Sequence, residues 1–133
     1  MSEGRYSRNA GAVFSLKYHL VWCPKYRRSV LEGGVSRRLD EIVRRVASEL
    51  DATVLGLEVM PDHVHLFVES DPRWAVAGLV GRFKGATSRQ LRAEFPHLRS
   101  KLPTLWSRSY YAGSVGAVSE ATIRRYIAAQ KGV

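Results

Sequence analysis

The sequence lacks the features that mark secreted and membrane proteins. Its 133 residues include a single cysteine, Cys23, so no disulfide forms within the chain, and a reducing compartment is the expected setting. The stretch up to Ala12 is polar and has no apolar core of a secretory signal. No apolar run approaches the ~20 residues that cross a bilayer. These absences predict a soluble, cytoplasmic protein without a membrane partner.

Acidic residues are also scarce. Lys and Arg number 21 against 12 Asp and Glu, which gives a net charge of +9 and a pI near 10.2. This excess favours a polyanionic partner, either nucleic acid or an anionic membrane surface. Basic residues mixed with aromatic rings, as at residues 25–28, suit single-stranded nucleic acid, and a nucleoid-associated location follows. The candidate DNA contacts, each alternatively an ordinary surface charge, are Lys25, Arg27, Arg28, Arg82, Lys84 and Arg108.

The spacing of apolar residues predicts a single α+β domain. Alternation predicts strands at residues 13–22, 53–60, 63–69 and 105–112. Helical spacing predicts a helix capped by Ser36 that runs to about Leu50, and another that begins at Asp71-Pro72. The order β-α-β-β-α-β predicts a ferredoxin-like, RRM-like antiparallel sheet with helices on one face, followed by a terminal helix at about 119–130. Residues 1–12 are expected to be a flexible basic arm and residues 13–133 the domain.

Two histidines share one face of the strand predicted at residues 63–69. His63 and His65 alternate with Val64, Leu66 and Val68, and side chains at i and i+2 leave the same face about 6.6 Å apart. Two imidazoles so placed are able to converge on one divalent ion. The alternative is a half-exposed strand that happens to carry two histidines. His19 shares a strand face with Lys17 and is equally explained as solvated, and His97 is not expected to be a ligand.

The predicted terminal helix carries Tyr126 and Gln130 on one side, together with Ile123 and Ile127. A helix of about twelve residues is marginal alone in water, so it must dock on another part of the fold. If it docks near the histidines, it brings a phenol and an amide oxygen to them. Otherwise the four residues are an apolar packing stripe with Gln130 at its rim.

With these motifs in view, the chain resembles the single-tyrosine HUH transposases, the TnpA-type, IS200-like enzymes of small bacterial insertion sequences. It is also similar to the REP-associated tyrosine transposases. The matching blocks run in the family's order over nearly the whole chain. They are Tyr18-His19-Leu20-Val21-Trp22 with Lys25-Tyr26-Arg27-Arg28, Met60-Pro61-Asp62-His63-Val64-His65, Phe83-Lys84-Gly85-Ala86-Thr87-Ser88, Leu105-Trp106-Ser107-Arg108-Ser109-Tyr110-Tyr111 and Tyr126-Ile127-Ala128-Ala129-Gln130.

The resemblance implies a role for each of four residues. His63 and His65 would be metal ligands, Gln130 the third ligand, and Tyr126 the nucleophile that forms a 5′-phosphotyrosine link with single-stranded DNA. Two imidazoles and one amide oxygen suit Mg²⁺ or Mn²⁺. The resemblance further implies a homodimer, with the terminal helix of one subunit a candidate to complete the site of the other. The expected partners are DNA hairpins at the ends of an insertion sequence, with no small-molecule substrate.

Two other functions remain open from the sequence. One is a domesticated HUH nickase that processes chromosomal repeats, which the DNA flanking the gene would distinguish from a mobile element. The other is a non-enzymatic, RRM-like module that stacks bases on the aromatic residues of its sheet. Binding without metal and without cleavage would favour that module.

Overall fold

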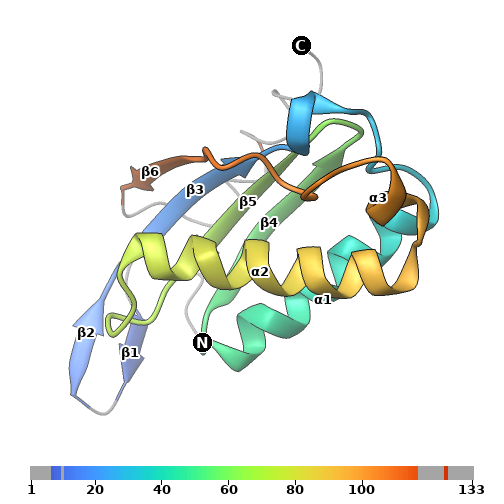
Figure 1. The fold of residues 1–133 in the computed structure, drawn as a ribbon. Coiled ribbons are helices and arrows are strands. Elements are labelled where there is room, and N and C mark those ends of the chain that lie inside the picture. Colours follow the sequence, from blue (N-terminus) through green and yellow to red (C-terminus); the bar gives the residue numbers. More distant parts are fainter. Residues whose placement is uncertain (1–6, 10, 117–124, 126–133) are drawn as a thin grey trace.

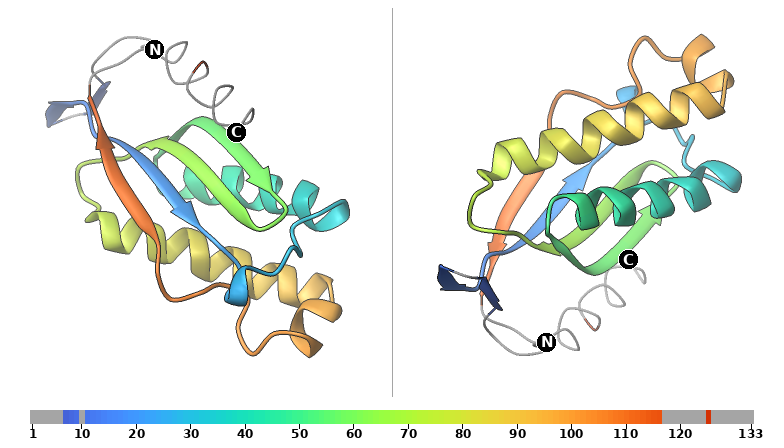
Figure 2. Two further views of the ribbon diagram at one scale, coloured as in Figure 1. Left: turned by 90° about the horizontal axis from the view of Figure 1, so that it is seen from above. Right: turned by 90° about the horizontal axis from the view of Figure 1, so that it is seen from below.

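A four-stranded sheet and two long helices form the framework of the fold. The computed structural model of the chain describes residues 7–9, 11–116 and Arg125. In this part the main sheet is antiparallel with the order β4-β5-β3-β6, and α1 and α2 pack together across one of its faces (Figures 1 and 2). The elements are β1 Ser7–Asn9, β2 Ala12–Phe14, β3 Lys17–Trp22, the 3₁₀ turn η1 Lys25–Arg27, α1 Gly34–Glu49, β4 Thr53–Met60, β5 His63–Glu69, α2 Val76–Glu94, α3 His97–Ser100 and β6 Tyr111–Val115.

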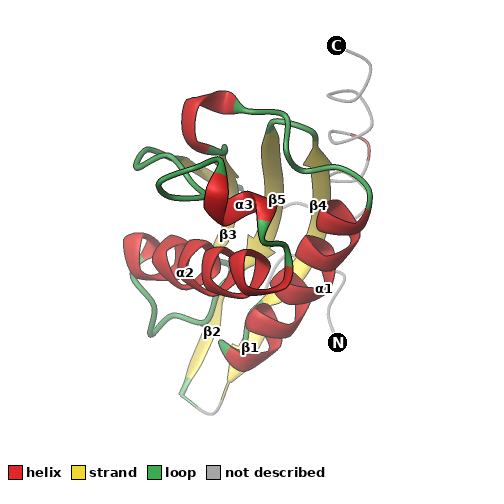
Figure 3. Cartoon of the chain, turned by 45° about the vertical axis from the view of Figure 1, so that its right-hand side comes forward, coloured by secondary structure: helices red, strands yellow, loops and turns green. Residues whose placement is uncertain are grey.

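The predicted α+β fold with β-α-β-β-α-β order is confirmed. Both long helices lie on the same side of the sheet (Figure 3). The predicted terminal helix with Tyr126 and Gln130 lies, apart from Arg125, outside the described residues. Within the described ranges, no helix has the length and apolar character needed to cross a bilayer.

The helices close one face of the sheet with an apolar layer. On β5, Val64, Leu66 and Val68 are fully buried, and they pack in one cluster with residues of α1 and α2 such as Leu39 and Phe83. Burying each large apolar side chain contributes roughly 1.5–3 kcal/mol, so the sheet can turn only this face toward the helices. The alternation predicted for the strand is confirmed from His63 to Leu66, whereas Phe67 and Glu69, which lie on the other face, are buried as well. The histidines therefore lie on the opposite face.

Two strand boundaries differ from the prediction. The strand expected over 13–22 is divided, because β2 ends at Phe14 after pairing with β1, and β3 begins only at Lys17. Part of the stretch expected to be a flexible arm therefore forms a hairpin. The strand expected over 105–112 is found at Tyr111–Val115. The aromatic run before it serves the core instead: Trp106 is buried, and its indole donates a hydrogen bond to Thr87 Oγ1 at 3.0 Å.

Neither long helix begins at its predicted cap. α1 begins at Gly34 because Gly33 has a φ of 57°, which glycine tolerates, and this turns the chain into the helix before Ser36 is reached. α2 begins at Val76, well beyond the Asp71-Pro72 pair. Asp71 Oδ1 accepts a hydrogen bond from the Arg73 amide at 2.9 Å, so this aspartate stabilises a turn that precedes the helix. An aspartate side chain is suited both to capping a helix and to stabilising a turn, which explains why the predicted start of α2 was too early.

A buried ion pair joins β3 and β5 on the face away from the helices. Lys17 and Glu69 lie directly opposite each other in the register of β3 and β5, and Lys17 Nζ is 3.6 Å from Glu69 Oε2. Both residues are buried although both carry a charge. Removing one partner leaves a charge buried, so we expect Glu69→Leu to lower the free energy of unfolding by about 3–5 kcal/mol. The double variant Lys17→Met, Glu69→Leu should regain most of this loss, since neither charge then remains.

Urea unfolding of the single and double variants measures both effects. The matched control is Arg44→Ala, which removes an exposed pair with Asp40 and should change the stability by less than about 0.5 kcal/mol. A Glu69→Leu protein no less stable than this control would show that the buried pair contributes nothing.

Candidate functional site

The face of the sheet opposite the helices carries a cluster of aromatic and ionisable side chains. It is built by cross-strand register, because residues directly opposite each other in an antiparallel sheet share a face. From β4 to β6, one row holds Glu58, His65, Val21 and Tyr111, and the next holds Gly56, Phe67, His19 and Gly113. His63 begins β5 beside the first row, where it pairs with Met60.

The two histidines predicted as ligands do lie together. Their ring centroids are 4.8 Å apart, and the ring planes are nearly perpendicular at 77°. His63 Nδ1 lies 2.7 Å from Asp62 Oδ1. The hydrogen bond from His63 lowers the pKa of Asp62, with the positive charge of Arg27 acting in the same direction. An ionised carboxylate only accepts hydrogen bonds, so His63 donates from Nδ1, and its Nε2 lone pair is left for another partner.

His19 lies beside the two predicted ligands, a contact that the sequence interpretation did not predict. Its Nε2 lies 3.0 Å from His65 Nδ1, and its ring stacks on Phe67 with centroids 4.3 Å apart. Burial, assisted by the nearby His65, lowers the pKa of His19 to about 4, so this imidazole is neutral at pH 7 and able to accept a hydrogen bond. In the tautomer in which His65 donates from Nδ1, its Nε2 carries the lone pair, as in His63. Only the pairing of β3 with β5 shows this relationship, because the two histidines are 46 residues apart.

The phenol of Tyr111 also lies at this cluster. Tyr111 is exposed, and its ring centroid is 5.7 Å from that of His19 in an edge-to-face arrangement. The hydroxyl lies over Gly113 on the same strand, where a side chain of any size would clash with it. Glycine at this position therefore allows the ring to lie toward His19.

The predicted DNA-contacting residues fall into different surroundings. Arg27 Nη2 donates to Asp62 Oδ2 at 3.1 Å, and the Lys25 ammonium lies 5.5 Å from the Tyr26 ring centroid. The Arg82 guanidinium stacks over Trp74 at 5.1 Å. Arg28 and Arg108 are exposed.

Lys84 makes contacts that hold the loop before β6. Its Nζ donates to the Ser107 carbonyl at 2.7 Å and to those of Arg108 and Ser109 at 3.3 Å. Burial lowers the pKa of Lys84. The ammonium thus stabilises the main chain that leads into β6.

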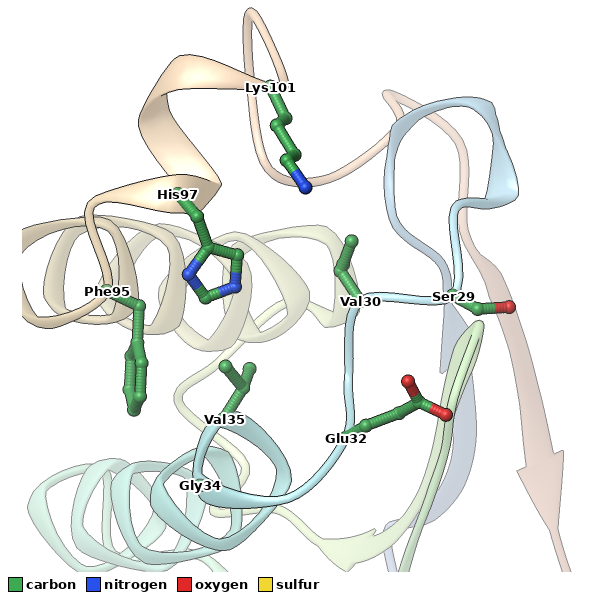
Figure 4. Close-up of a pocket in the computed structure, with 8 residues that line it drawn as sticks. All are labelled: Ser29, Val30, Glu32, Gly34, Val35, Phe95, His97 and Lys101. Atoms are coloured by element: carbon green, nitrogen blue, oxygen red, sulfur yellow. The ribbon is translucent and has the colours of Figure 1, made fainter.

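A hollow of about 370 Å³ lies apart from the histidines, beside the start of α1. It is lined by Ser29, Val30, Glu32, Gly34, Val35, Phe95, His97 and Lys101 (Figure 4). His97 is thus found here and not with His63 and His65, as expected. No residue of the two rows described above lines the hollow, so it plays no part in the histidine cluster.

The contacts of His63 and His65 show how far these two residues are suited to bind a metal ion. Among the described residues, no group of three or more His, Cys, Asp or Glu side chains is arranged to hold a metal ion. His63 and His65 fit the task as a pair, because each has a hydrogen-bonding neighbour at Nδ1, and the tautomer protonated there offers Nε2 to a metal ion. Gln130, the expected third ligand, and Tyr126, the expected nucleophile, lie outside the described residues.

Known proteins share this fold and these motifs. A family model described as "Transposase IS200 like" matches residues 12–130, which is most of the chain. The chain belongs to the IS200-like transposases. The predicted family is therefore confirmed, and with it a role in DNA transposition.

Relatives of this IS200-like transposase match it over most of their length. The ISDra2 transposase TnpA of Deinococcus radiodurans is 40% identical over 132 residues, which cover 98% of this chain and 91% of that protein. The transposase for insertion sequence element IS200 of Salmonella typhimurium is 34% identical over 116 residues, covering 86% of this chain and 76% of the relative.

Two solved structures share the arrangement of strands and helices. A crystal structure of a candidate transposase from Deinococcus radiodurans R1 has a TM-score of 0.76 and 38% identity, and the match covers 93% of this chain and 97% of that one. A REP-associated tyrosine transposase bound to a REP hairpin has a TM-score of 0.55 at 14% identity, with 91% and 67% covered. The second likeness shows the fold alone.

Proposed function

We propose that this IS200-like transposase cleaves and rejoins single-stranded DNA by transesterification, with Tyr126 as nucleophile and a divalent metal ion at His63 and His65. The observation that carries the proposal is that the two imidazoles lie side by side on one face of the sheet, each with a hydrogen-bonding neighbour at Nδ1. With the proton on Nδ1, each ring offers Nε2 to a metal ion. Gln130 would add an amide oxygen. Nitrogen and oxygen donors in this combination suit Mg²⁺ or Mn²⁺.

The metal ion and the protein would share the chemistry. A bound divalent ion polarises a phosphodiester and stabilises the charge that develops on it. Tyr126 must lose a proton, which costs about 4 kcal/mol at pH 7 for a phenol with a pKa near 10. Its oxygen then forms a bond to the phosphorus, the bond from phosphorus to the 3′ oxygen breaks, and that oxygen takes up a proton. Because the energy of the ester is kept in the phosphotyrosine, a 3′-hydroxyl is able to reverse the step without ATP.

The proposed partners follow from charge and family. A net charge of +9 supports binding to a DNA backbone. The structural neighbour bound to a REP hairpin makes hairpins at the ends of the element the candidate substrate. We propose a cytoplasmic, nucleoid-associated homodimer in which the terminal helix of one subunit is a candidate to complete the site of the other.

A covalent-adduct assay tests the proposal. Single-stranded oligonucleotides that tile the DNA on both sides of the gene, labelled at the 3′ end, are incubated with the protein and Mn²⁺. The proposal predicts a labelled adduct that survives SDS and is absent in EDTA. Cleavage without an adduct would contradict it, and metal-independent binding without cleavage would favour a non-enzymatic module. Adducts with chromosomal repeats but not with the gene's flanks would favour a domesticated nickase.

The hydrogen bond between His19 and His65 should set the metal affinity. A residue that orients a ligand typically contributes 10- to 100-fold, so we expect His19→Ala to weaken Mn²⁺ binding by about that factor. His19→Gln should keep most of the affinity, because its amide oxygen is able to accept from His65 Nδ1. Electron paramagnetic resonance of free Mn²⁺ measures the binding, with His97→Ala as the matched control. Equal affinity in His19→Ala and the control would exclude this role for His19.

A further inference from the structure

The loop that follows β3 holds an aromatic side chain in an unfavourable backbone conformation. Tyr26 has a φ of 61° and Arg27 a φ of 51°, both in the left-handed region that non-glycine residues rarely adopt. Tyr26 is also 67% exposed. Neither the backbone nor burial of the ring favours a tyrosine here, and such departures persist mainly where function requires them.

Main-chain contacts hold this loop in place on both sides. The Lys25 amide donates to the Leu105 carbonyl at 2.8 Å, and the Ser107 amide donates to the Cys23 carbonyl at 2.9 Å. Beyond the loop, the Leu31 amide donates to the Pro61 carbonyl at 3.0 Å. The loop is therefore fastened to the segment before β6 and to the turn before His63. Tyr26 is held facing outward from this fastened base.

Hydrogen bonds also connect the loop to the proposed metal site. Arg27 Nη2 donates to one oxygen of Asp62 at 3.1 Å, and the other oxygen of that carboxylate accepts from His63 at 2.7 Å. Three cations, Lys25, Arg27 and Arg28, flank the tyrosine in sequence. An exposed ring beside several cations is the combination that binds single strands, since the cations follow phosphates while the ring stacks on a base.

We propose that Tyr26 is a stacking platform for one unpaired nucleobase of the single strand that is cleaved. This inference rests on the proposed function, because the strand that would stack on Tyr26 is the one whose phosphate would lie at His63 and His65. Stacking on a ring face is tolerant of sequence, so the ligand is any unpaired base at one fixed position in the strand. The positive φ of Tyr26 is then the backbone conformation that directs the ring toward that base.

Binding of single-stranded DNA, measured under conditions in which no cleavage occurs, tests the stacking role of Tyr26 separately from the proposed reaction. Each variant is combined with Tyr126→Phe, and its affinity for a single-stranded oligothymidine is measured in EDTA by fluorescence anisotropy. Loss of a stacked base should weaken binding by roughly 5- to 150-fold in Tyr26→Ala, whereas Tyr26→Phe should bind within about twofold of the parent. The matched control is Tyr110→Ala, which removes another exposed tyrosine and should leave the affinity within about twofold.

Tyr26→Gly separates stacking from a structural role. Glycine tolerates the positive φ, so the melting temperature of the Tyr26→Gly variant should equal or exceed that of the parent. The affinity of this variant for the oligothymidine should fall as in Tyr26→Ala. Photocrosslinking to a strand that carries 5-iododeoxyuridine should label Tyr26. Equal binding by Tyr26→Ala, Tyr110→Ala and the parent would overturn the platform. The covalent adduct formed by the wild-type protein would then still support the proposed reaction.

Discussion

Replacement of His65 by Ala is expected to reduce metal-dependent cleavage of single-stranded DNA by about 10³-fold or more. The reason is that the variant lacks one of two nitrogen donors, and a metal ion at a phosphodiester contributes several kcal/mol to transition-state stabilisation. At 1.36 kcal/mol per tenfold, about 4 kcal/mol corresponds to that factor. Single-turnover cleavage of a labelled oligonucleotide at fixed Mn²⁺ measures the loss.

His97→Ala is the control for His65→Ala, since it removes a histidine that lies at the hollow beside α1 and not at the sheet face. Its cleavage rate should match that of the wild type. Raising the Mn²⁺ concentration should restore part of the activity of His65→Ala, because Asp62 still orients His63. Full activity of His65→Ala at low Mn²⁺ would contradict the assignment of the ligand.

Replacement of Tyr126 by Phe is expected to abolish the covalent adduct while leaving strand binding unchanged. Phenylalanine has the same ring but no oxygen to attack the phosphorus, so no phosphotyrosine is able to form. The expected loss is at least about 10³-fold in adduct yield, as for removal of a nucleophile in general. Gel electrophoresis in SDS measures the adduct, and anisotropy in EDTA measures the binding.

Tyr111 makes the strictest control for this experiment, because its exposed phenol lies at the histidine cluster, with its ring 5.7 Å from His19. Tyr111→Phe should form the adduct at close to the wild-type yield. If Tyr111→Phe abolished the adduct and Tyr126→Phe did not, the nucleophile would be the tyrosine on β6, and the proposed role of the terminal segment would be wrong.

Features that depend on local periodicity were predictable from the sequence. The alternation of Val64, Leu66 and Val68 with His63 and His65 determines which face of β5 packs against the helices, and the structure agrees. The order of strands and helices followed from the same kind of pattern. Local patterns suffice here because burial of one face decides how an amphipathic element is oriented.

Features that depend on pairing between distant segments were not predictable. Nothing near His19 in the sequence indicates His65, and only the alignment of β3 with β5 brings the two imidazoles within hydrogen-bonding distance. The run at 105–112 has the composition of a strand, yet the Trp106 indole is buried and donates a hydrogen bond to Thr87 on α2. The tie from Arg27 to Asp62 likewise joins a loop to a turn 35 residues away.

Peptide mapping of the adduct is the most direct test of the proposed mechanism. Trypsin should cut after Arg125 and after Lys131, which places Tyr126 in a peptide separate from the one that holds Tyr110 and Tyr111. Mass spectrometry of the digested adduct should find the 5′-phosphate of the nucleotide remnant on the Tyr126 peptide. A remnant on the peptide with Tyr110 and Tyr111, or on no tyrosine at all, would contradict the mechanism.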